Sequence, residues 1–147
     1  MQMINDWFSE HKDAILVTDK INEPQKMAVA FNFKERLIME LFSWQTIDEA
    51  IKIGITPMAS QDVLFVPDKK EVLNLLEKKN IKFACFSVRL IENNRNFIDE
   101  LRQNNIKCYV FHVNYDDGID ENYVFNNYFT QIYGMYADNF VILQTKK

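Results

Sequence analysis

Six short apolar segments recur along the chain, and most of them follow a stretch with the apolar spacing of a helix. Each segment has the length of a β-strand and ends in small, polar or charged residues. Strands that alternate with helices form parallel βα units, so we expect an α/β fold with the helices on the outer side of a parallel sheet. The expected strands lie near residues 14–19, 37–42, 55–59, 83–88, 108–113 and 133–137.

The segments between these strands predict six helices. Thr46 is expected to cap one of them, with Glu49 completing a capping box. Gly54 is suited to end that helix. The stretch 60–67 is expected to be a loop, or a loop that holds a short strand at 63–66, and 140–143 form an apolar tail. The predicted helices span residues 3–12, 23–33, 46–53, 71–79, 97–103 and 121–129.

Two features of the pattern bear on the sheet. The run from Ala14 to Val17 is entirely apolar, which is typical of a strand buried on both sides. The tripeptide Asn-Ile-Lys occurs at 80–82 and again at 105–107, each time between a helix and a strand. This spacing of 25 residues (105 − 80) fits one helix-plus-strand unit of a parallel sheet.

Composition narrows the class of protein. With 147 residues, 48% of them hydrophobic, the chain is long enough for a single globular domain with its own core. The formal net charge is −4 and the charges are intermixed, so no basic stripe points to nucleic acid. No segment has the length of a membrane span or the pattern of a signal peptide, so we expect a cytoplasmic protein. Cys85 and Cys108 lie in apolar segments and are expected to be buried.

In parallel sheets the functional groups gather at the carboxyl ends of the strands. Asp19 ends an apolar strand, where it is either a metal ligand or general base, or else a turn aspartate. Glu40 shares one face of its strand with Ile38 and Phe42, and that face belongs either to a site or to an edge open to water. Asp138 resembles Asp19 in its placement after a strand.

Two further residues are candidates. Arg89 follows a strand and could bind a phosphate, although an arginine there more often pairs with a surface acid. His112 lies on a strand beside Asn114, and a single strand histidine is more often structural than a ligand. The chain has no GxGxxG or GxxxxGK loop for a nucleotide and no GxSxG turn for a serine nucleophile.

Four motifs, taken in order, resemble the C-terminal part of the glycerophosphodiester phosphodiesterase family, within the phospholipase-C-like phosphodiesterases. They are Val17-Thr18-Asp19-Lys20, residues 36–42, residues 109–114 and residues 134–138, within a likeness over about 5–141. They are similar to the family's V-T-D-x-K, R-x-I-P-Q-x-Y, V-Y-V-x-T-V-N and G-x-Y-T-D. The resemblance implies part of a TIM-type (β/α) barrel that lacks about the first three strands.

The resemblance also implies which site residues remain. The family's H-R-G, E-x-D and H-D motifs, which supply the acid/base histidines and most ligands of a divalent metal (Mg²⁺ or Ca²⁺), have no counterpart here. Asp19 matches an acidic metal ligand, with Glu40 and Asp138 as weaker candidates. The family lysine lies two residues beyond the aspartate, where this chain has Ile21, so strand alternation places Lys20 away from the site.

Two functions from different classes follow. In the first, the chain is part of a glycerophosphodiester-hydrolysing barrel and is not active alone, with Lys20 and His112 as weak catalytic candidates and Arg89 as a weak substrate contact. In the second, it is a non-catalytic module for self-association or binding. The expected partner is a second copy or a missing N-terminal half of the barrel. A receiver or flavodoxin-like domain is a weaker third reading, because an early acidic pair and a phosphate loop are absent.

Overall fold

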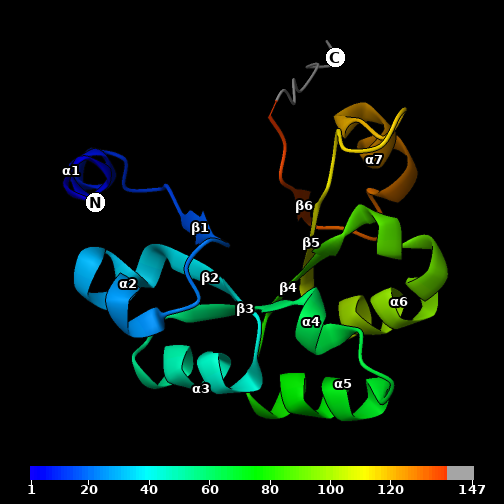
Figure 1. The fold of residues 1–147 in the computed structure, drawn as a ribbon, viewed down its shortest axis with the longest axis horizontal. Coiled ribbons are helices and arrows are strands. Elements are labelled where there is room, and N and C mark those ends of the chain that lie inside the picture. Colours follow the sequence, from blue (N-terminus) through cyan, green and yellow to red (C-terminus); the bar gives the residue numbers. More distant parts are fainter. Residues whose placement is uncertain (139–147) are drawn as a thin grey trace. The chain divides into compact units, whose positions relative to one another are not determined.

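The fold is α/β, and in the described part of the chain six strands follow one another in the sheet in sequence order (Figure 1). The computed structural model describes residues 1–138. Each register that is described is parallel, as the sequence predicts. The strands are β1 (Leu16–Thr18), β2 (Leu37–Leu41), β3 (Thr56–Ser60), β4 (Phe83–Ser87), β5 (Lys107–Phe111) and β6 (Gly134–Met135). The predicted apolar tail at 140–143 lies outside the described residues.

All six predicted helices are present, together with a short seventh. The extra helix, α4 (Gln61–Leu64), replaces the predicted loop or strand because Val63 and Leu64 turn inward and are buried. Three 3₁₀ turns lie at 34–36, 88–90 and 92–94. The longer helices are α1 (Gln2–Glu10), α2 (Pro24–Ala30), α3 (Trp44–Lys52), α5 (Lys69–Lys78), α6 (Arg95–Gln103) and α7 (Glu121–Tyr128).

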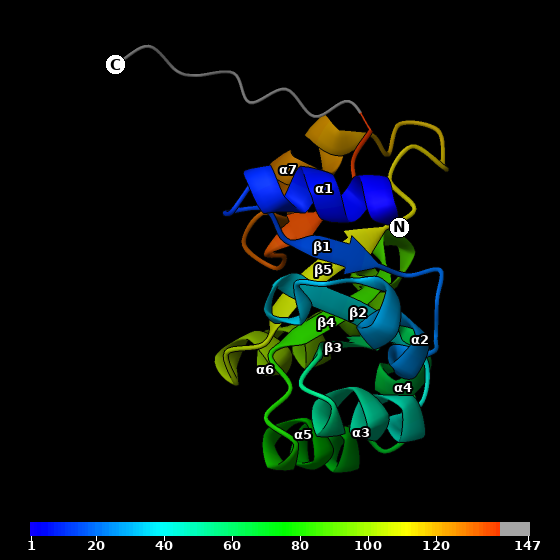
Figure 2. The same ribbon diagram turned by 90° about the vertical axis from the view of Figure 1, so that its left-hand side faces the viewer.

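The chain divides into two compact units, Met1–Cys85 and Phe86–Lys147, and the division falls within β4. In the N-terminal unit, Figure 2 shows β1, β2 and β3 in succession, with α1 next to β1. Helix α3 packs against β2 and β3. In the C-terminal unit, α6 packs against β5, and β5 pairs with β6.

The core of the N-terminal unit lies between the sheet and its helices. Leu37, Met39 and Leu41 alternate along β2 and are fully buried on one face. Ile47 and Ala50 of α3 are equally buried. A parallel strand covered by helices buries its apolar side chains in this way. The opposite face of β2 carries Ile38 and Glu40, as the strand alternation predicts.

Three helices end with the same local structure. Gly54, Asn80 and Asn105 each take a left-handed backbone conformation, with φ of 80°, 52° and 59°. The isoleucine that follows each of them is buried, and its N–H donates to a carbonyl oxygen five residues back, at 2.9, 2.9 and 3.0 Å. This is the Schellman ending, in which glycine or asparagine closes the helix and a hydrophobic residue seals it. The repeated Asn-Ile-Lys is therefore a helix exit that leads into a strand.

The start of α3 differs from the prediction. Ser43, not Thr46, is the N-cap, and its hydroxyl oxygen accepts a hydrogen bond from the Thr46 N–H at 3.2 Å. Thr46 donates its own hydroxyl to the Ser43 carbonyl, and Glu49 bonds to Gln45 instead of closing a capping box. Serine and threonine are both good N-cap residues. Because α3 begins at Trp44, the residue before it, Ser43, is the N-cap.

The burial predicted for the first strand is wrong. Strand β1 is only half-buried along its length, and Ile15 just before it is 59% exposed. The reason is topological, because β1 comes first in the sheet order and has a strand on one side only among the described residues. An entirely apolar strand can therefore remain partly exposed in the described part of the chain.

Candidate functional site

In the N-terminal unit, a buried carboxylate lies on the face of β2 opposite to Leu37, Met39 and Leu41. Glu40 is only 3% exposed, and it accepts hydrogen bonds from the Ser60 hydroxyl and the Cys85 thiol. The register explains the grouping, since Glu40 pairs with Met58 and Ser60 pairs with Cys85, so the three side chains share one face. Of the two positions that the sequence allowed for Glu40, the one open to water is excluded.

Burial raises the pKa of the Glu40 carboxyl above its ordinary value of 4.5, because a buried anion has lost its water. The Ser60 and Cys85 hydrogen bonds lower the pKa again, and the charges of Asp19 and Asp62 raise it further. Asp19 follows β1 directly, where its carboxylate lies 2.9 Å from the ammonium of Lys20. The Lys20 side chain is 85% exposed, and the prediction that it points away from the site stays a prediction.

The residues of this face do not by themselves fit a divalent cation. Within residues 1–138, no three His, Cys, Asp or Glu side chains come together in an arrangement that could hold a metal ion. Asp19 already has a lysine partner, and burial favours the protonated, neutral form of Glu40. Mg²⁺ and Ca²⁺ take six or more oxygen ligands, so this part of the chain offers an incomplete set.

In the C-terminal unit, Arg89 is held by an aspartate. Its Nε and Nη2 donate to the two carboxylate oxygens of Asp116, each at 2.6 Å. This two-pronged ion pair lowers the pKa of the Asp116 carboxyl. Of the two predicted roles for Arg89, the pairing with a surface acid is the one observed.

His112 lies just beyond β5, not within it, and its ring contacts β4. Its Nδ1 is 3.0 Å from the Ser87 hydroxyl oxygen, which also accepts the Arg89 N–H at 3.3 Å. Burial, and then the charge of Arg89, lower the pKa of the His112 imidazole, while Asp116 raises it. The ring is therefore neutral at neutral pH.

A buried glutamate anchors the segment after His112. Glu121, at the start of α7, is buried, and its Oε1 accepts the Asn114 side-chain amide at 2.8 Å. The same oxygen accepts the backbone N–H of Asp138 at 3.2 Å. Asp138 thus contributes its backbone to this anchor, and its side chain is exposed.

Sequence reasoning missed Ser60, Ser87 and Glu121. Each of the two serines ends a strand at the position where the expected sites lie, which is a usable signal. Glu121 gives no such signal, because a glutamate in the first turn of a helix is ordinarily a solvated residue that favours the helix dipole.

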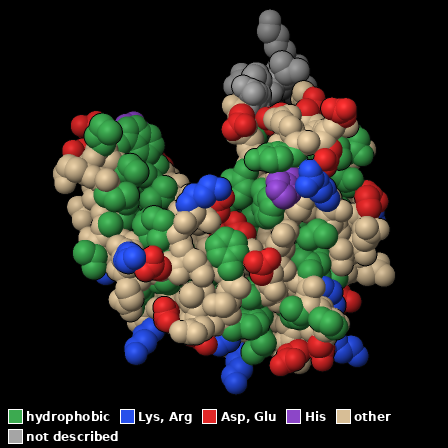
Figure 3. All heavy atoms as spheres, viewed as in Figure 1, with side chains coloured by type: hydrophobic (Ala, Val, Ile, Leu, Met, Phe, Trp, Pro, Cys, Tyr) green, Lys and Arg blue, Asp and Glu red, His purple; other side chains and the backbone are tan. Residues whose placement is uncertain are grey.

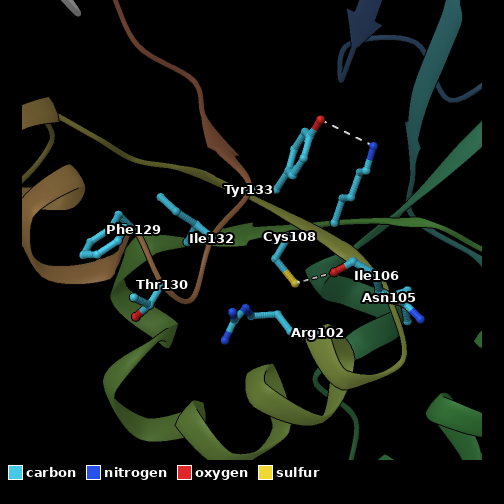
Figure 4. A pocket seen from close by; sticks show the side chains of 9 residues that line it. Arg102, Asn105, Ile106, Cys108, Phe129, Thr130, Ile132 and Tyr133 are labelled. Atoms are coloured by element: carbon cyan, nitrogen blue, oxygen red, sulfur yellow. Dashed lines mark hydrogen bonds between the residues drawn. The ribbon is translucent and has the colours of Figure 1, made fainter. Parts of the chain in front are cut away.

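A pocket with two basic residues in its lining lies at the opposite, amino end of β5 (Figure 4). It has a volume of about 340 Å³, and Arg102 and Lys107 are among its lining residues. Both cations have partners, since Arg102 pairs with Asp99 and the Lys107 ammonium lies 4.5 Å from the centre of the Tyr133 ring. Burial raises the pKa of the Cys108 thiol in its wall to about 12.

Two further observations concern the surface charge and the helices. In Figure 3, acidic and basic side chains are interspersed over the face in view, which gives no basic stripe there. Among residues 1–138, none of the helices is long and apolar enough to cross a membrane.

Comparison with known proteins establishes the fold. No protein-family model matches the chain, and no curated protein matches it. Among solved structures, the chain is similar to the crystal structure of a glycerophosphodiester phosphodiesterase from Thermotoga maritima, with a TM-score of 0.64 and 19% sequence identity. The match covers 84% of this chain and 53% of that one, so this chain spans about half the length of that protein. The fold is accordingly that of a partial TIM-type (β/α) barrel.

Proposed function

We propose that this chain is one part of a phosphodiesterase-like barrel that hydrolyses glycerophosphodiesters when the rest of the barrel is supplied, by further sequence or by another chain. The observation that carries the proposal is the fold match with a glycerophosphodiester phosphodiesterase over most of this chain. The ordered resemblance from Val17-Thr18-Asp19-Lys20 to Gly134–Asp138 supports it.

The arrangement of polar groups also supports this proposal. Asp19 and Glu40 in one unit, and Ser87 and His112 in the other, each lie at or beyond the middle of a strand, toward its carboxyl end. Ligands of parallel α/β folds bind at that end. The basic pocket of Figure 4 lies at the amino end of β5. A phosphate ligand bound at the carboxyl ends of the strands would therefore contact different residues from one bound in this pocket.

Alone, the chain should turn over phosphodiesters slowly or not at all. The resemblance assigns the acid/base histidines to motifs that residues 1–138 do not contain, and the metal ligands present are too few. Removing groups that act as a unit costs most of a rate enhancement, about 10⁶-fold in a well-studied protease.

The first test is ligand binding by amide NMR. Glycerol 3-phosphate should shift amide signals near Asp19 and Ser60 if it binds the N-terminal unit, or near Ser87 and His112 if it binds the C-terminal unit. Signals of Lys82 and Lys107 at the strand starts should stay unchanged. Shifts confined to Arg102 and Lys107 would place the ligand in the basic pocket and contradict the proposal.

The second test is turnover of glycerophosphocholine by the chain with and without Mg²⁺, Ca²⁺ or Mn²⁺. We expect none above the buffer rate. Asp19→Asn is compared with Asp13→Asn, an exposed aspartate that precedes the same strand at its amino end. Metal-dependent turnover that only Asp19→Asn abolishes would contradict the expected inactivity, and would mean that a second copy supplies the missing half or that it is not needed.

A non-catalytic, self-associating module is the second candidate, and exposed apolar side chains at the β1 edge favour it. Met3 and Trp7 of α1 are exposed, as is Ile15. Figure 3 shows hydrophobic side chains gathered where α1 lies in Figure 1. An open parallel edge with apolar neighbours tends to acquire a partner strand. A dimer that forms without any phosphate response in the NMR test would favour this candidate over the first.

A further inference from the structure

His112 has an unusual backbone conformation. Its φ is 62°, in the left-handed region, and Asn114 two residues later has a φ of 66°. The other two non-glycine residues with positive φ in the described part of the chain, Asn80 and Asn105, close helices, whereas His112 directly follows a strand. A left-handed conformation is unfavourable for a non-glycine residue, so something must hold His112 there.

The loop after His112 supplies that restraint. The Asn114 N–H donates to the Ile119 carbonyl oxygen at 2.8 Å, and the Asn114 amide donates to the buried Glu121 carboxylate. These bonds fix the backbone on the far side of His112. The left-handed step then takes the His112 ring out of the strand alternation and toward the end of β4.

The ring is fixed from several sides. Nδ1 of His112 bonds to Ser87, which is buried, and the ring packs against those of Phe111 and Tyr115, with centres 4.7 and 4.8 Å away. Within residues 1–138, the second ring nitrogen, Nε2, has no hydrogen-bond partner. The result is a half-buried imidazole with one nitrogen held and the other available.

We propose that Nε2 of His112 is the proton acceptor that this chain contributes to phosphodiester hydrolysis, and that Ser87 is the positioning residue that sets its tautomer. This inference rests on the proposed function for its substrate class. A serine oxygen can accept two hydrogen bonds. Ser87 accepts a hydrogen bond from the Arg89 N–H, and its oxygen lies 3.0 Å from Nδ1 of His112, where it would accept Nδ1–H.

The proposed step balances as follows. A water oxygen forms a bond to phosphorus while Nε2 takes its proton, and the bond from phosphorus to the alcohol oxygen breaks. The imidazolium then returns the proton to that alkoxide, so the products are an alcohol and a phosphate monoester. The step needs a neutral imidazole ring. Burial and the charge of Arg89 lower the pKa of His112 by more than the charge of Asp116 raises it, which favours the neutral ring.

The chain has only two histidines, so His11 serves as an internal control. Imidazole ¹⁵N NMR reports which nitrogen carries the proton. We expect the Nδ1–H tautomer at His112, its loss in Ser87→Ala and its retention in Ser87→Thr, with the His11 signals unchanged in both variants. A merely structural role for Ser87 would not move the tautomer. An Nε2–H tautomer in the unsubstituted protein, or no response to Ser87→Ala, would overturn the assignment.

Diethyl pyrocarbonate, which acylates neutral imidazole, then tests the nitrogen itself. The pH midpoint for His112 modification should lie below the 6.5 of an ordinary imidazole side chain, and slow or absent modification would overturn the proposal. Glycerol 3-phosphate should slow modification of His112 and leave that of His11 unchanged. Correct tautomer and reactivity without this protection would support the proton acceptor and count against the phosphodiester substrate, so the two failures are distinguishable.

Discussion

The guanidinium of Arg36 binds the end of α1 through Phe8, since its Nη2 donates to the Phe8 carbonyl oxygen at 3.0 Å and its carbon lies 5.2 Å from the centre of the Phe8 ring. Nη1 donates to the carbonyl oxygens of His11 and Lys12 at 2.8 and 3.1 Å. The last carbonyls of a helix have no partner within it, and this cation binds one of them, that of Phe8, together with the carbonyls of His11 and Lys12 just beyond the helix. The same guanidinium lies 4.2 Å from the centre of the Phe33 ring.

Arg36→Ala should therefore release α1 from its unit. The loss of charge-assisted hydrogen bonds and of cation–π contacts is expected to lower the free energy of unfolding by about 2–4 kcal/mol. Urea unfolding followed by tryptophan fluorescence measures it, because Trp7 lies on α1. Arg95→Ala is the control, since Arg95 pairs with Glu92 at the surface, with side chains 46% and 56% exposed, and its removal should change little. Equal effects of the two substitutions would contradict the role of Arg36.

Glu40→Gln should change how stability depends on pH. Burial raises the pKa of Glu40 in the folded protein, so the folded state holds its proton more tightly than the unfolded state. Its contribution is fully present below the ordinary value of 4.5 and is lost as the pH rises through the raised folded value. The native protein should lose stability relative to Glu40→Gln as the pH rises above 4.5. Denaturant unfolding at a series of pH values above 4.5 measures this difference in the free energy of unfolding. Glu77→Gln, at an exposed position, is the control and should not change the pH dependence of stability.

Ile15→Lys tests the open strand edge. A lysine beside β1 would leave the fold intact, because Ile15 is largely exposed, but would oppose pairing with another strand. We expect the unsubstituted chain to self-associate at tens of micromolar and Ile15→Lys to be monomeric. Light scattering after size-exclusion chromatography gives the mass. Val29→Lys places the same charge on exposed α2 and should leave association unchanged. A monomeric unsubstituted chain would disprove association through this edge.

Gly134→Ala should destabilise the pairing of β5 with β6. A Cβ at Gly134 would lie 2.8 Å from Cε1 of the Tyr109 ring, its register partner, and the ring would have to move. Overpacking of this kind costs about 1–3 kcal/mol. Tyr109→Leu in the same chain should recover part of the loss, whereas Ala137→Ser, in the exposed segment that follows, should cost little. Additive losses for the double variant would argue against the steric contact.

The strands could be predicted because each is a short apolar segment with a polar end, and alternation along β2 predicted the face on which Glu40 lies. Its grouping with Ser60 depends on the register of the folded sheet. The site in the C-terminal unit could not be predicted in the same way. Alternation along β5 gives no account of His112, because its left-handed step breaks the alternation. Arg89 and Asp116 are 27 residues apart in sequence, and only the folded chain shows that they meet. The exposure of β1 depends on which strands lie next to it in the sheet, and these neighbours cannot be read from the sequence of β1 alone.

The helix exits at Asn80 and Asn105 have a consequence at the level of the gene. Each exit consists of the same three residues, Asn-Ile-Lys, in the same backbone conformation, and each leads directly into a strand. An in-frame deletion of residues 81–105 would join Asn80 to Ile106 and leave the exit sequence unchanged at the junction. A tandem duplication of the same stretch would likewise preserve both junctions. Unequal recombination could therefore remove or add a helix-plus-strand unit here without creating a mismatched join, which gives this chain a route to change its strand number in one step.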